Sequence, residues 1–511
     1  MADTQPGAAA GTAAAYTTLG AHPALADYLR RIRPEEGMLL GGRMTAASDG
    51  GTFDVVDPAS NAAFARCTDA TTEDAARAVD AASEALPAWS ATPPRQRAEL
   101  LRTLFDLMVG QAEELAVLIS AENGKSVDDA RAEVLYAAEF FRWFSEEAVR
   151  TEGGFGSSPA GGTRTIVTQR PIGVVAMITP WNFPAAMGTR KIAPALAAGC
   201  TVVLRPASLT PLTAVALSHL ILQAGVPAGV VNIVPSSRSA EVSTTWLEDP
   251  RVRAVSFTGS TQVGRVLMKQ AAEKVLVSSM ELGGNAPFVV AADADIDAAV
   301  TGAVQAKLRG GGEACTAANR FYVHQDVAQE FTEKFSAVVR DLRVGPALAD
   351  EANQIGPLVT TAARDKINAL VDGAVAGGAV VYAESSWPQE SAGAFIPVRV
   401  LTNVAPDAEI VRTEIFGPVA PIITWDDEDE LLTWINDTDY GLSGYVFSRD
   451  LGWALRLAER MEVGMVGINR GLVSDPAAPF GGVKQSGIGR EGAREGIREF
   501  QETQYYSVAW S

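Results

Sequence analysis

The feature that most constrains the fold of this chain is an alternation of short β-branched runs with helical patterns between residues 172 and 290. The runs span residues 174–179, 201–205, 230–234, 254–257 and 275–281, and helical apolar spacing occupies 185–198, 212–224 and 261–273. Strands about 20 to 30 residues apart with helices between them are typical of βαβ units, whose strands are parallel. The sequence therefore predicts an α/β fold with a Rossmann-type sheet.

A second alternation follows Gly284, with strand-like runs at 287–290, 320–323 and 418–423 and helical runs at 296–308, 327–342 and 451–460. It predicts a second α/β domain. Residues 153–170 are different, because a glycine-rich stretch is followed by strand-like alternation, and residues 505–510 are also strand-like. These two segments have little to pack on in their own domains, so we expect them to form a small β arm that contacts another subunit.

Composition excludes several classes of function. The formal charge of −19 argues against nucleic acid and anionic membranes as partners. No apolar stretch reaches the roughly 18 residues of a membrane span, and residues 1–22 resemble a disordered tail rather than a secretion signal. Three cysteines without a CxxC pair argue against a disulfide framework or a metal site, so we expect a cytoplasmic protein.

Cys315 lies in a glycine-rich run, Arg309-Gly-Gly-Gly-Glu-Ala-Cys315, and Glu281 precedes another glycine pair. These residues suggest a thiol nucleophile and a general base. A buried inert thiol and a solvated loop glutamate are the alternatives. None of the three histidines is placed in a pattern that would make it the base.

Three further motifs end predicted strands. Gly259 and Ser260 open a helix whose free N–H groups suit a pyrophosphate. Arg205 and Ser208 end another strand, where a ribose would bind in a doubly wound fold. Asn182, between two prolines, could donate to an oxyanion. An ordinary turn, a surface arginine with a helix-capping serine, and a rigid loop are the respective alternatives.

Taken together, the motifs resemble the aldehyde dehydrogenase superfamily from about residue 38 to the end of the chain. The matching runs are Pro180-Trp-Asn-Phe-Pro184, Phe257-Thr-Gly-Ser-Thr261, Glu281-Leu-Gly-Gly284, Cys315, Glu414-Ile-Phe-Gly-Pro418 and Pro479-Phe-Gly-Gly482 with Lys484, Ser486 and Gly487. Their order and spacing make the resemblance specific. It implies a coenzyme-binding domain at 23–152 and 172–283, a catalytic domain at 284–484, and an oligomerisation arm at 153–171 and 485–511 that builds a homo-oligomer.

The resemblance implies that Cys315 attacks an aldehyde to give a thiohemiacetal and then a thioester. Asn182 would stabilise the oxyanion, and Glu281 would activate the hydrolytic water. The coenzyme-binding residues implied by the resemblance are Trp181, Asn182, Arg205, Pro206, Ala207, Ser208, Gly259, Ser260, Leu282, Glu414 and Phe416.

Two departures from the family pattern concern the coenzyme. Arg205 stands where the family usually has lysine, and Ser208 stands where NAD-preferring members often have glutamate. Serine beside a guanidinium would accept a 2′-phosphate, so we expect NADP to be used at least as well as NAD. Arg238 is a further candidate for reaching that phosphate.

Arg190, Arg309 and Ser474 resemble the carboxylate-binding set of succinate-semialdehyde dehydrogenases. They imply oxidation of succinate semialdehyde to succinate, with glutarate semialdehyde or broader aldehydes as the alternative. One arginine could instead pair with a nearby acid such as Glu313. Alanine at position 317, where some relatives have a second cysteine, predicts no local disulfide switch.

Gly310 and Gly311 replace bulkier residues that are common in the family, so we expect a mobile nucleophile loop. Two other classes of protein remain as alternatives. A CoA-acylating dehydrogenase is disfavoured by Glu281, which suits water as the final acceptor. A binding protein on a dehydrogenase scaffold is disfavoured by the intact set of Cys315, Glu281 and Asn182.

Overall fold

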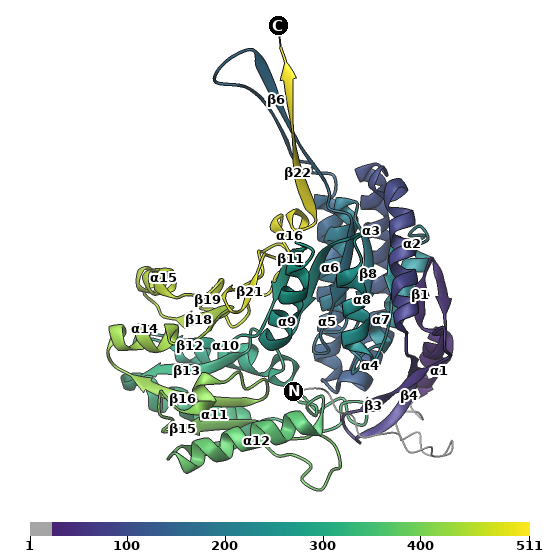
Figure 1. Ribbon diagram of the computed structural model, residues 1–511. Helices are drawn as coiled ribbons and strands as arrows, with labels where there is room; N and C mark the ends of the chain where they lie inside the picture. Colours follow the sequence, from purple (N-terminus) through teal and green to yellow (C-terminus); the bar gives the residue numbers. More distant parts are fainter. Residues whose placement is uncertain (1–22, 511) are drawn as a thin grey trace.

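Two sheets, each flanked by helices, form the body of the molecule, and a thin β arm projects from it (Figure 1). The computed structural model describes residues 23–510, so the predicted tail at 1–22 and Ser511 lie outside the described residues. The α/β class predicted from the sequence is confirmed by the parallel pairing within both sheets. No helix among residues 23–510 is long and apolar enough to cross a membrane.

The first sheet has the strand order β2-β1-β9-β8-β7-β10-β11-β21. Its strands are β1 (Met38–Leu40), β2 (Arg43–Thr45), β7 (Val174–Ile178), β8 (Thr201–Arg205), β9 (Val231–Ile233), β10 (Val252–Thr258), β11 (Val277–Glu281) and β21 (Gly487–Ile488). Strands β7 to β11 are parallel, and the order runs outward from β7 in both directions. This arrangement opens a crevice at the carboxyl ends of β7 and β10, where doubly wound folds bind ligands.

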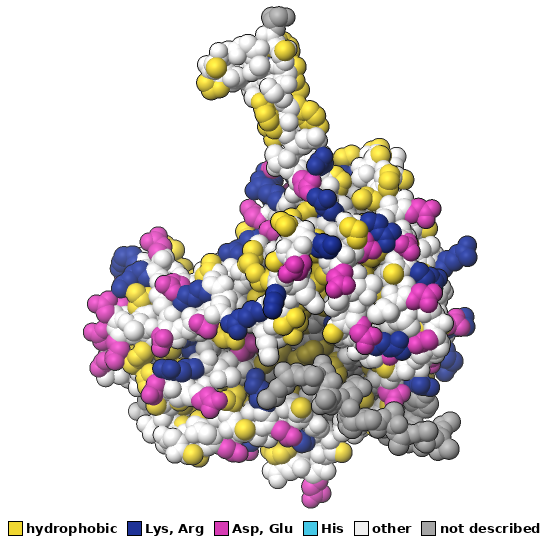
Figure 2. Space-filling view, viewed as in Figure 1, with side chains coloured by type: hydrophobic (Ala, Val, Ile, Leu, Met, Phe, Trp, Pro, Cys, Tyr) yellow, Lys and Arg dark blue, Asp and Glu magenta, His cyan; other side chains and the backbone are white. Residues whose placement is uncertain are grey.

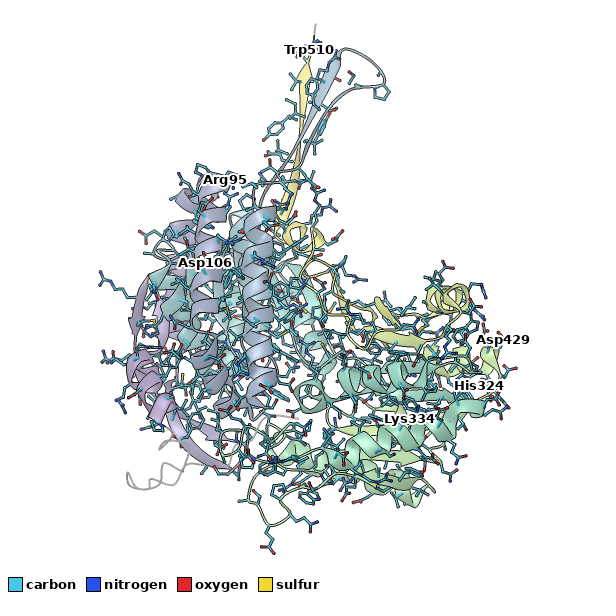
Figure 3. All side chains as sticks on the ribbon, turned by 180° about the vertical axis from the view of Figure 1, so that it is seen from behind. Arg95, Asp106, His324, Lys334, Asp429 and Trp510 are labelled. Carbon is cyan, nitrogen blue, oxygen red and sulfur yellow. The ribbon has the colours of Figure 1, made fainter. Side chains whose placement is uncertain are left out.

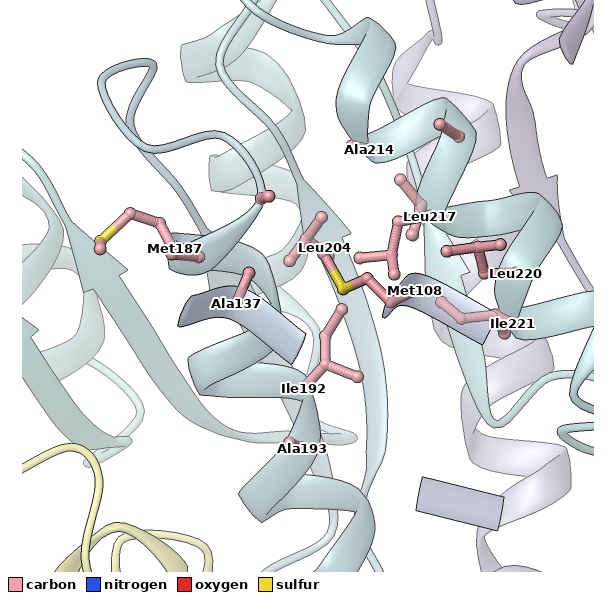
Figure 4. Packing of buried hydrophobic residues seen from close by; sticks show 14 of the residues in the cluster. Met108, Ala137, Met187, Ile192, Ala193, Leu204, Ala214, Leu217, Leu220 and Ile221 are labelled. Carbon is pink, nitrogen blue, oxygen red and sulfur yellow. The ribbon is translucent and has the colours of Figure 1, made fainter. Parts of the chain in front are cut away.

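Two helix layers cover the first sheet. The helices are α1 (Pro23–Ile32), η2 (Pro34–Glu36), α2 (Thr72–Ser90), α3 (Pro94–Gly110), α4 (Ala112–Asn123), α5 (Val127–Glu147), α6 (Ala186–Ala198), α7 (Leu212–Gln223), α8 (Ser239–Glu248) and α9 (Thr261–Ala272). Helices α2, α8 and α9 contact one face, whereas α6 and α7 contact the other and separate it from α3, α4 and α5. Figure 4 shows Met108 of α3 packed among Ile192, Leu204 and Leu217 in this layer.

The second sheet has the order β14-β15-β16-β13-β12-β18-β19 and is parallel except for the edge strand β14. Its strands are β12 (Ala286–Val290), β13 (Ala318–His324), β14 (Val380–Glu384), β15 (Arg399–Thr402), β16 (Val419–Trp425), β18 (Ser443–Phe447) and β19 (Met465–Ile468). Its helices are α10 (Ile296–Leu308), η3 (Arg309–Gly312), α11 (Gln325–Asp341), α12 (Thr361–Ala376), α13 (Glu409–Arg412), α14 (Glu428–Asn436) and α15 (Leu451–Arg460). Phe288 and Phe321 lie in the core on one face, and Tyr322 and Leu431 lie in the core on the other.

The arm is a three-stranded antiparallel sheet formed by β5 (Gly153–Ser157), β6 (Thr163–Pro171) and β22 (Gln501–Ala509), with β6 in the middle. The short helix α16 (Glu495–Arg498) precedes β22, and two small sheets, β3 (Thr52–Asp57) with β4 (Ala62–Thr68) and β17 (Tyr440–Gly441) with β20 (Val483–Lys484), complete the fold. Apolar side chains run along the arm in Figure 2, and Trp510 lies near its tip in Figure 3. Phe155 is 70% exposed and Tyr505 is 58% exposed.

Two local expectations were wrong, and one helix was missed. The strand expected from residue 275 begins at Val277, because Val275 has a φ of 54° and is 89% exposed at a turn. Helix α8 was not predicted. Residues 487–488, expected in the arm, pair instead with β11 at the edge of the first sheet.

Candidate active site

A cavity of about 300 Å³ contains most of the predicted site residues. The members of the predicted set that line it are Trp181, Asn182, Arg190, Gly259, Ser260, Leu282, Arg309, Cys315, Glu414, Phe416 and Ser474. Arg190 lies in α6 and Arg309 in η3, whereas the others lie in loops, several of them at the carboxyl ends of β7, β10 and β11. The fold therefore joins segments that are far apart in the sequence. Glu281 and residues 205–208 lie outside the lining.

Cys315 follows the turn η3, whose three glycines all have left-handed backbones, with φ of 58° at Gly310, 65° at Gly311 and 81° at Gly312. A Cβ on Gly312 would lie 2.6 Å from the backbone of Gly417, so that position requires glycine. The thiol is half-buried. Burial raises the pKa of Cys315 to about 12, although the Arg190 charge opposes this shift.

Asn182 is fixed through both its side chain and its backbone. Its Nδ2 donates to the carbonyl of Glu313 at 2.9 Å, two residues before Cys315. Its own carbonyl accepts from Lys125 Nζ at 2.6 Å. Because an amide nitrogen carries two hydrogens, one remains for an oxygen in the cavity.

Glu281 is the last residue of β11 and is 3% exposed. Among the described residues, neither carboxylate oxygen has a hydrogen-bond partner. Burial raises the pKa of Glu281 well above its usual value, and the charge of Glu491 raises it further. The Glu281 charge in turn raises the pKa of Cys315, so the two groups interact electrostatically. An unpaired buried carboxyl with a shifted pKa is typical of a proton-transfer group.

Arg190 forms a buried ion pair, with its Nε 2.8 Å from Oε2 of Glu491. Its guanidinium also lies 4.0 Å from the ring centre of Phe480. Lys191 binds the other carboxylate oxygen of Glu491 at 2.5 Å. One predicted substrate arginine is therefore paired with an acid, as the alternative allowed, but that acid is Glu491 and not Glu313.

Arg309 is held differently. Its guanidinium lies over the rings of Phe183, at 4.9 Å, and Tyr136, at 5.5 Å. Arg309 forms no ion pair with a carboxylate of residues 23–510. Its charge does oppose the rise in the pKa of Asp129 that burial causes. The hydroxyl of Tyr136, which also lines the cavity, is buried without a hydrogen-bond partner among these residues. This end of the cavity therefore offers a positive charge and a hydroxyl donor.

A second group of residues around the cavity suits a nucleotide coenzyme. Ser260 begins α9, where its hydroxyl accepts from Val263 N, and Gly259 N donates to the carbonyl of Glu281. Glu414 accepts from Gly284 N at 3.0 Å, and burial raises its pKa to about 7. Thr258 Oγ1 is buried without a hydrogen-bond partner within the described chain and faces the same cavity.

The carboxyl end of β8 adds a cation to this region. Arg205 Nη1 donates to Ser239 Oγ at 2.7 Å. Ser208 is partly exposed three residues later. The expected phosphate contact of Arg238 stays a prediction, and in this structure Arg238 pairs with Asp49 at 2.8 Å. Helix N–H groups, a guanidinium and two serine hydroxyls fit a phosphorylated dinucleotide.

Several residues around the site could not be predicted from sequence patterns. Tyr136 occupies a helix in which an aromatic side chain normally indicates core, and Ser239 begins the unpredicted helix α8. Glu491 is about 300 residues from its partners Arg190 and Lys191. One sequence signal was available for Lys125. It lies in the run Glu122-Asn-Gly-Lys125, in which Gly124, with a φ of 94°, ends helix α4.

A model described as the aldehyde dehydrogenase family matches residues 45–506. The chain is 52% identical to a succinate-semialdehyde dehydrogenase of Paenarthrobacter nicotinovorans, over 87% of this chain and 99% of that protein. It is 43% identical to a glutarate-semialdehyde dehydrogenase of Pseudomonas putida, over 92% and 97%. A solved NADP-dependent enzyme of E. coli superposes with a TM-score of 0.91 at 43% identity, covering 93% of this chain and 98% of that one.

The match over most of the chain agrees with the site geometry and with the predicted fold class. The chain belongs to the aldehyde dehydrogenase family and is an NAD(P)-dependent oxidoreductase that acts on an aldehyde.

Proposed function

We propose that the protein oxidises succinate semialdehyde to succinate and prefers NADP to NAD. The observation that carries the substrate is Arg309, which forms no ion pair among residues 23–510 and lies in the cavity that holds the thiol of Cys315. A semialdehyde acid presents one carboxylate to such a cation while its aldehyde reaches the thiol. The name of the Paenarthrobacter relative supports the same substrate.

Catalysis begins when Cys315 loses its proton to solvent and the thiolate attacks the aldehyde carbon. Asn182 Nδ2 and the Cys315 backbone N–H stabilise the oxyanion of the thiohemiacetal. The oxyanion collapses to a thioester as hydride leaves the carbon. The coenzyme, when bound, supplies the hydride acceptor, and the residues that would hold it are Arg205, Pro206, Ala207, Ser208, Gly259, Ser260, Leu282, Glu414, Phe416 and Trp181.

Glu281 in its ionised form then takes a proton from water, and the resulting hydroxide attacks the thioester. The carbon–sulfur bond breaks, Cys315 leaves as a thiolate, and Glu281 returns its proton to solvent. One aldehyde, one water and one oxidised coenzyme thus give one carboxylic acid, one reduced coenzyme and one proton.

The substrate carboxylate binds Arg309, the hydroxyl of Tyr136 and Ser474 in this proposal. Arg190 contributes mainly through charge, since Glu491 occupies its Nε and its positive charge lowers the pKa of Cys315. Preference for NADP rests on Arg205, Ser208 and Ser239, which supply a guanidinium and two hydroxyls at the carboxyl end of β8.

Glutarate semialdehyde is the second candidate, because the Pseudomonas putida relative bears that name. It differs from succinate semialdehyde by one methylene group, which a pocket discriminates by only about 10- to 200-fold. Steady-state kinetics with C4 and C5 semialdehyde acids, an uncharged aldehyde of similar length and both coenzymes tests the proposal. A kcat/KM for the uncharged aldehyde equal to that for the acids would overturn it.

We also infer that the arm joins subunits into a homo-oligomer, since β5, β6 and β22 expose Phe155 and Tyr505 to solvent. The domain division remains a proposal, with coenzyme binding at 23–152 and 172–283, catalysis at 284–484 and assembly by the arm strands β5, β6 and β22. A reducing compartment such as the cytoplasm would keep Cys315 free, as its role requires.

A further inference from the structure

We propose that Lys125 and the first two turns of α5 position both halves of the oxyanion site, with Asp129 holding the Cys315 loop and the Lys125–Glu133 pair holding the Asn182 loop. These side chains do not line the cavity, so they are positioning residues and not catalytic ones. The inference rests on the proposed roles of Cys315 and Asn182.

The first contact fixes the nucleophile loop. Asp129 Oδ2 accepts a hydrogen bond from Gly310 N at 2.9 Å. Gly310 is the first of three glycines with left-handed backbones, and such a run has more conformational freedom than any other before it folds. One charged acceptor at the start of this run limits the movement of Arg309 on one side and of Cys315 on the other.

The second contact fixes the amide loop. Lys125 Nζ donates to Glu133 Oε2 at 2.7 Å and to the carbonyl of Asn182 at 2.6 Å, with the Lys125 side chain 2% exposed and that of Glu133 fully buried. The other oxygen of Glu133 accepts from Ala185 N at 2.8 Å, and at 3.3 Å from Ala186 N.

Glu133 thereby supplies the cap that α6 lacks, because the residue before that helix is Ala185, which has no capping oxygen. A buried ion pair that also satisfies three backbone groups holds its neighbours in one geometry. Lys125 therefore links the Asn182 backbone to Glu133, and Glu133 is also the carboxylate that caps α6.

Asp129 and Glu133 are four residues apart, one turn of α5. Their spacing sets the distance between the two loops, which also contact each other through Asn182 Nδ2 and the Glu313 carbonyl. An oxyanion site depends on such spacing, because a misplacement of about 1 Å costs about 100-fold in rate.

The test compares Asp129→Ala with Asp129→Asn, which retains an acceptor oxygen, and with Asp128→Ala, a change in the adjacent, exposed acid that pairs with Arg131. A double variant, Lys125→Met with Glu133→Gln, removes the buried charges together and so leaves neither partner unpaired. Four quantities are measured in the full-length protein: kcat for the semialdehyde, hydrolysis of an activated ester without coenzyme, coenzyme dissociation constant, and the rate of Cys315 alkylation by iodoacetamide.

We expect kcat and ester hydrolysis to fall together by about 10- to 100-fold in Asp129→Ala and in the double variant. In these variants the alkylation rate, which involves no oxyanion, and the coenzyme dissociation constant should stay within about twofold of the wild-type values. Asp129→Asn should recover most of the lost activity. Asp128→Ala should have the activity of the wild type. Unchanged ester hydrolysis in Asp129→Ala, or equal losses in alkylation and hydrolysis, would overturn the inference. A wild-type protein that hydrolyses the ester in this pattern but oxidises no semialdehyde would refute the proposed function alone.

Discussion

Arg190 and Glu491 form a buried ion pair, with Nε 2.8 Å from Oε2, on the side of the site that also contains Glu281. The sequence predicted the same role, binding of the substrate carboxylate, for Arg190 and Arg309, but this ion pair involves Arg190 alone. Arg190 forms an ion pair with a carboxylate, whereas Arg309 packs against the rings of Tyr136 and Phe183 and forms no ion pair within the described chain, although its charge acts on Asp129. The two arginines should therefore respond differently to substitution.

Arg309→Gln should lower kcat/KM for succinate semialdehyde by about 30- to 100-fold, because a charged hydrogen bond to a carboxylate contributes about 2 to 3 kcal/mol. Oxidation of an uncharged aldehyde should change little. Arg190→Gln should instead slow alkylation of Cys315, because the arginine charge lowers the pKa of that thiol. Kinetics with the two aldehydes and an iodoacetamide rate assay check both expectations. Identical profiles for the two variants would contradict them.

Glu281→Gln should separate the two halves of the reaction. Loss of a general base typically lowers the rate by about 100- to 10,000-fold, and here it should affect thioester hydrolysis and leave hydride transfer. Rapid mixing should then show a burst of one reduced coenzyme per active site followed by slow turnover. Glutamine has the same shape and neither carboxylate oxygen is hydrogen-bonded within residues 23–510, so the fold should tolerate the change. A slow reaction without a burst would argue against this role.

Ser208→Glu should reverse the coenzyme preference. A carboxylate beside Arg205 would repel the 2′-phosphate and could bind the ribose hydroxyl of NAD. The ratio of kcat/KM for NADP to that for NAD should fall by about 100-fold, which corresponds to about 3 kcal/mol. Ser208→Ala serves as the control, since it removes the hydroxyl without adding charge. The prediction fails if the two variants give the same ratio.

Glu313→Gln should change the pH dependence of stability. Burial raises the pKa of Glu313 to about 8, whereas Val359 N, the hydrogen-bond donor to its carboxylate, opposes the shift. The folded state therefore holds this proton more tightly than the unfolded state, so the stabilisation is complete below about pH 4.5 and is lost as pH rises through 8. Urea unfolding at pH 5, 7 and 9 should show a wild-type advantage that shrinks with pH. Parallel curves for the two proteins would exclude this linkage.

Replacing Phe155 and Tyr505 with serine should reduce the mass of the assembly in light scattering. Both side chains are exposed on the arm, and an arm that joins subunits would bury them. Val380→Ser, in the equally exposed edge strand β14, is the matched control and should leave the mass unchanged. An unchanged mass in the arm variant would remove the arm from the interface.

Local signals were strong enough to predict several elements. Strand β8 and helix α10 have the predicted bounds, because each has a continuous apolar or periodic pattern. Helix α8 was missed because its serines and threonines have low helix propensity, and the buried Trp246, whose Nε1 donates to the carbonyl of Ala75, stabilises it through tertiary contact. Val275 shows the opposite error, because a β-branched residue that favours a strand adopts a left-handed backbone at a turn.

Some residues of the site could likewise be predicted from the sequence and others could not. Cys315, Asn182 and Arg309 could be proposed from their motifs, and the structure brings all three to one cavity. The pairing of Arg190 with Glu491 could not be predicted, because it joins residues about 300 positions apart. Nor could the sequence assign Tyr136 or Ser239, whose contacts depend on how helices pack.

Strand β21 pairs with β11, so Glu281 has Gly487 as its strand partner. During translation the ribosome completes β11 about 200 residues before it makes β21, and β22 emerges later still. Throughout that interval the edge of β11 lacks its partner, and exposed strand edges favour aggregation. Truncated or stalled chains that end before residue 487 would thus retain every proposed catalytic residue and yet have an open sheet edge. Residues 487–511, 25 in number, are therefore needed to protect the first sheet from aggregation during folding.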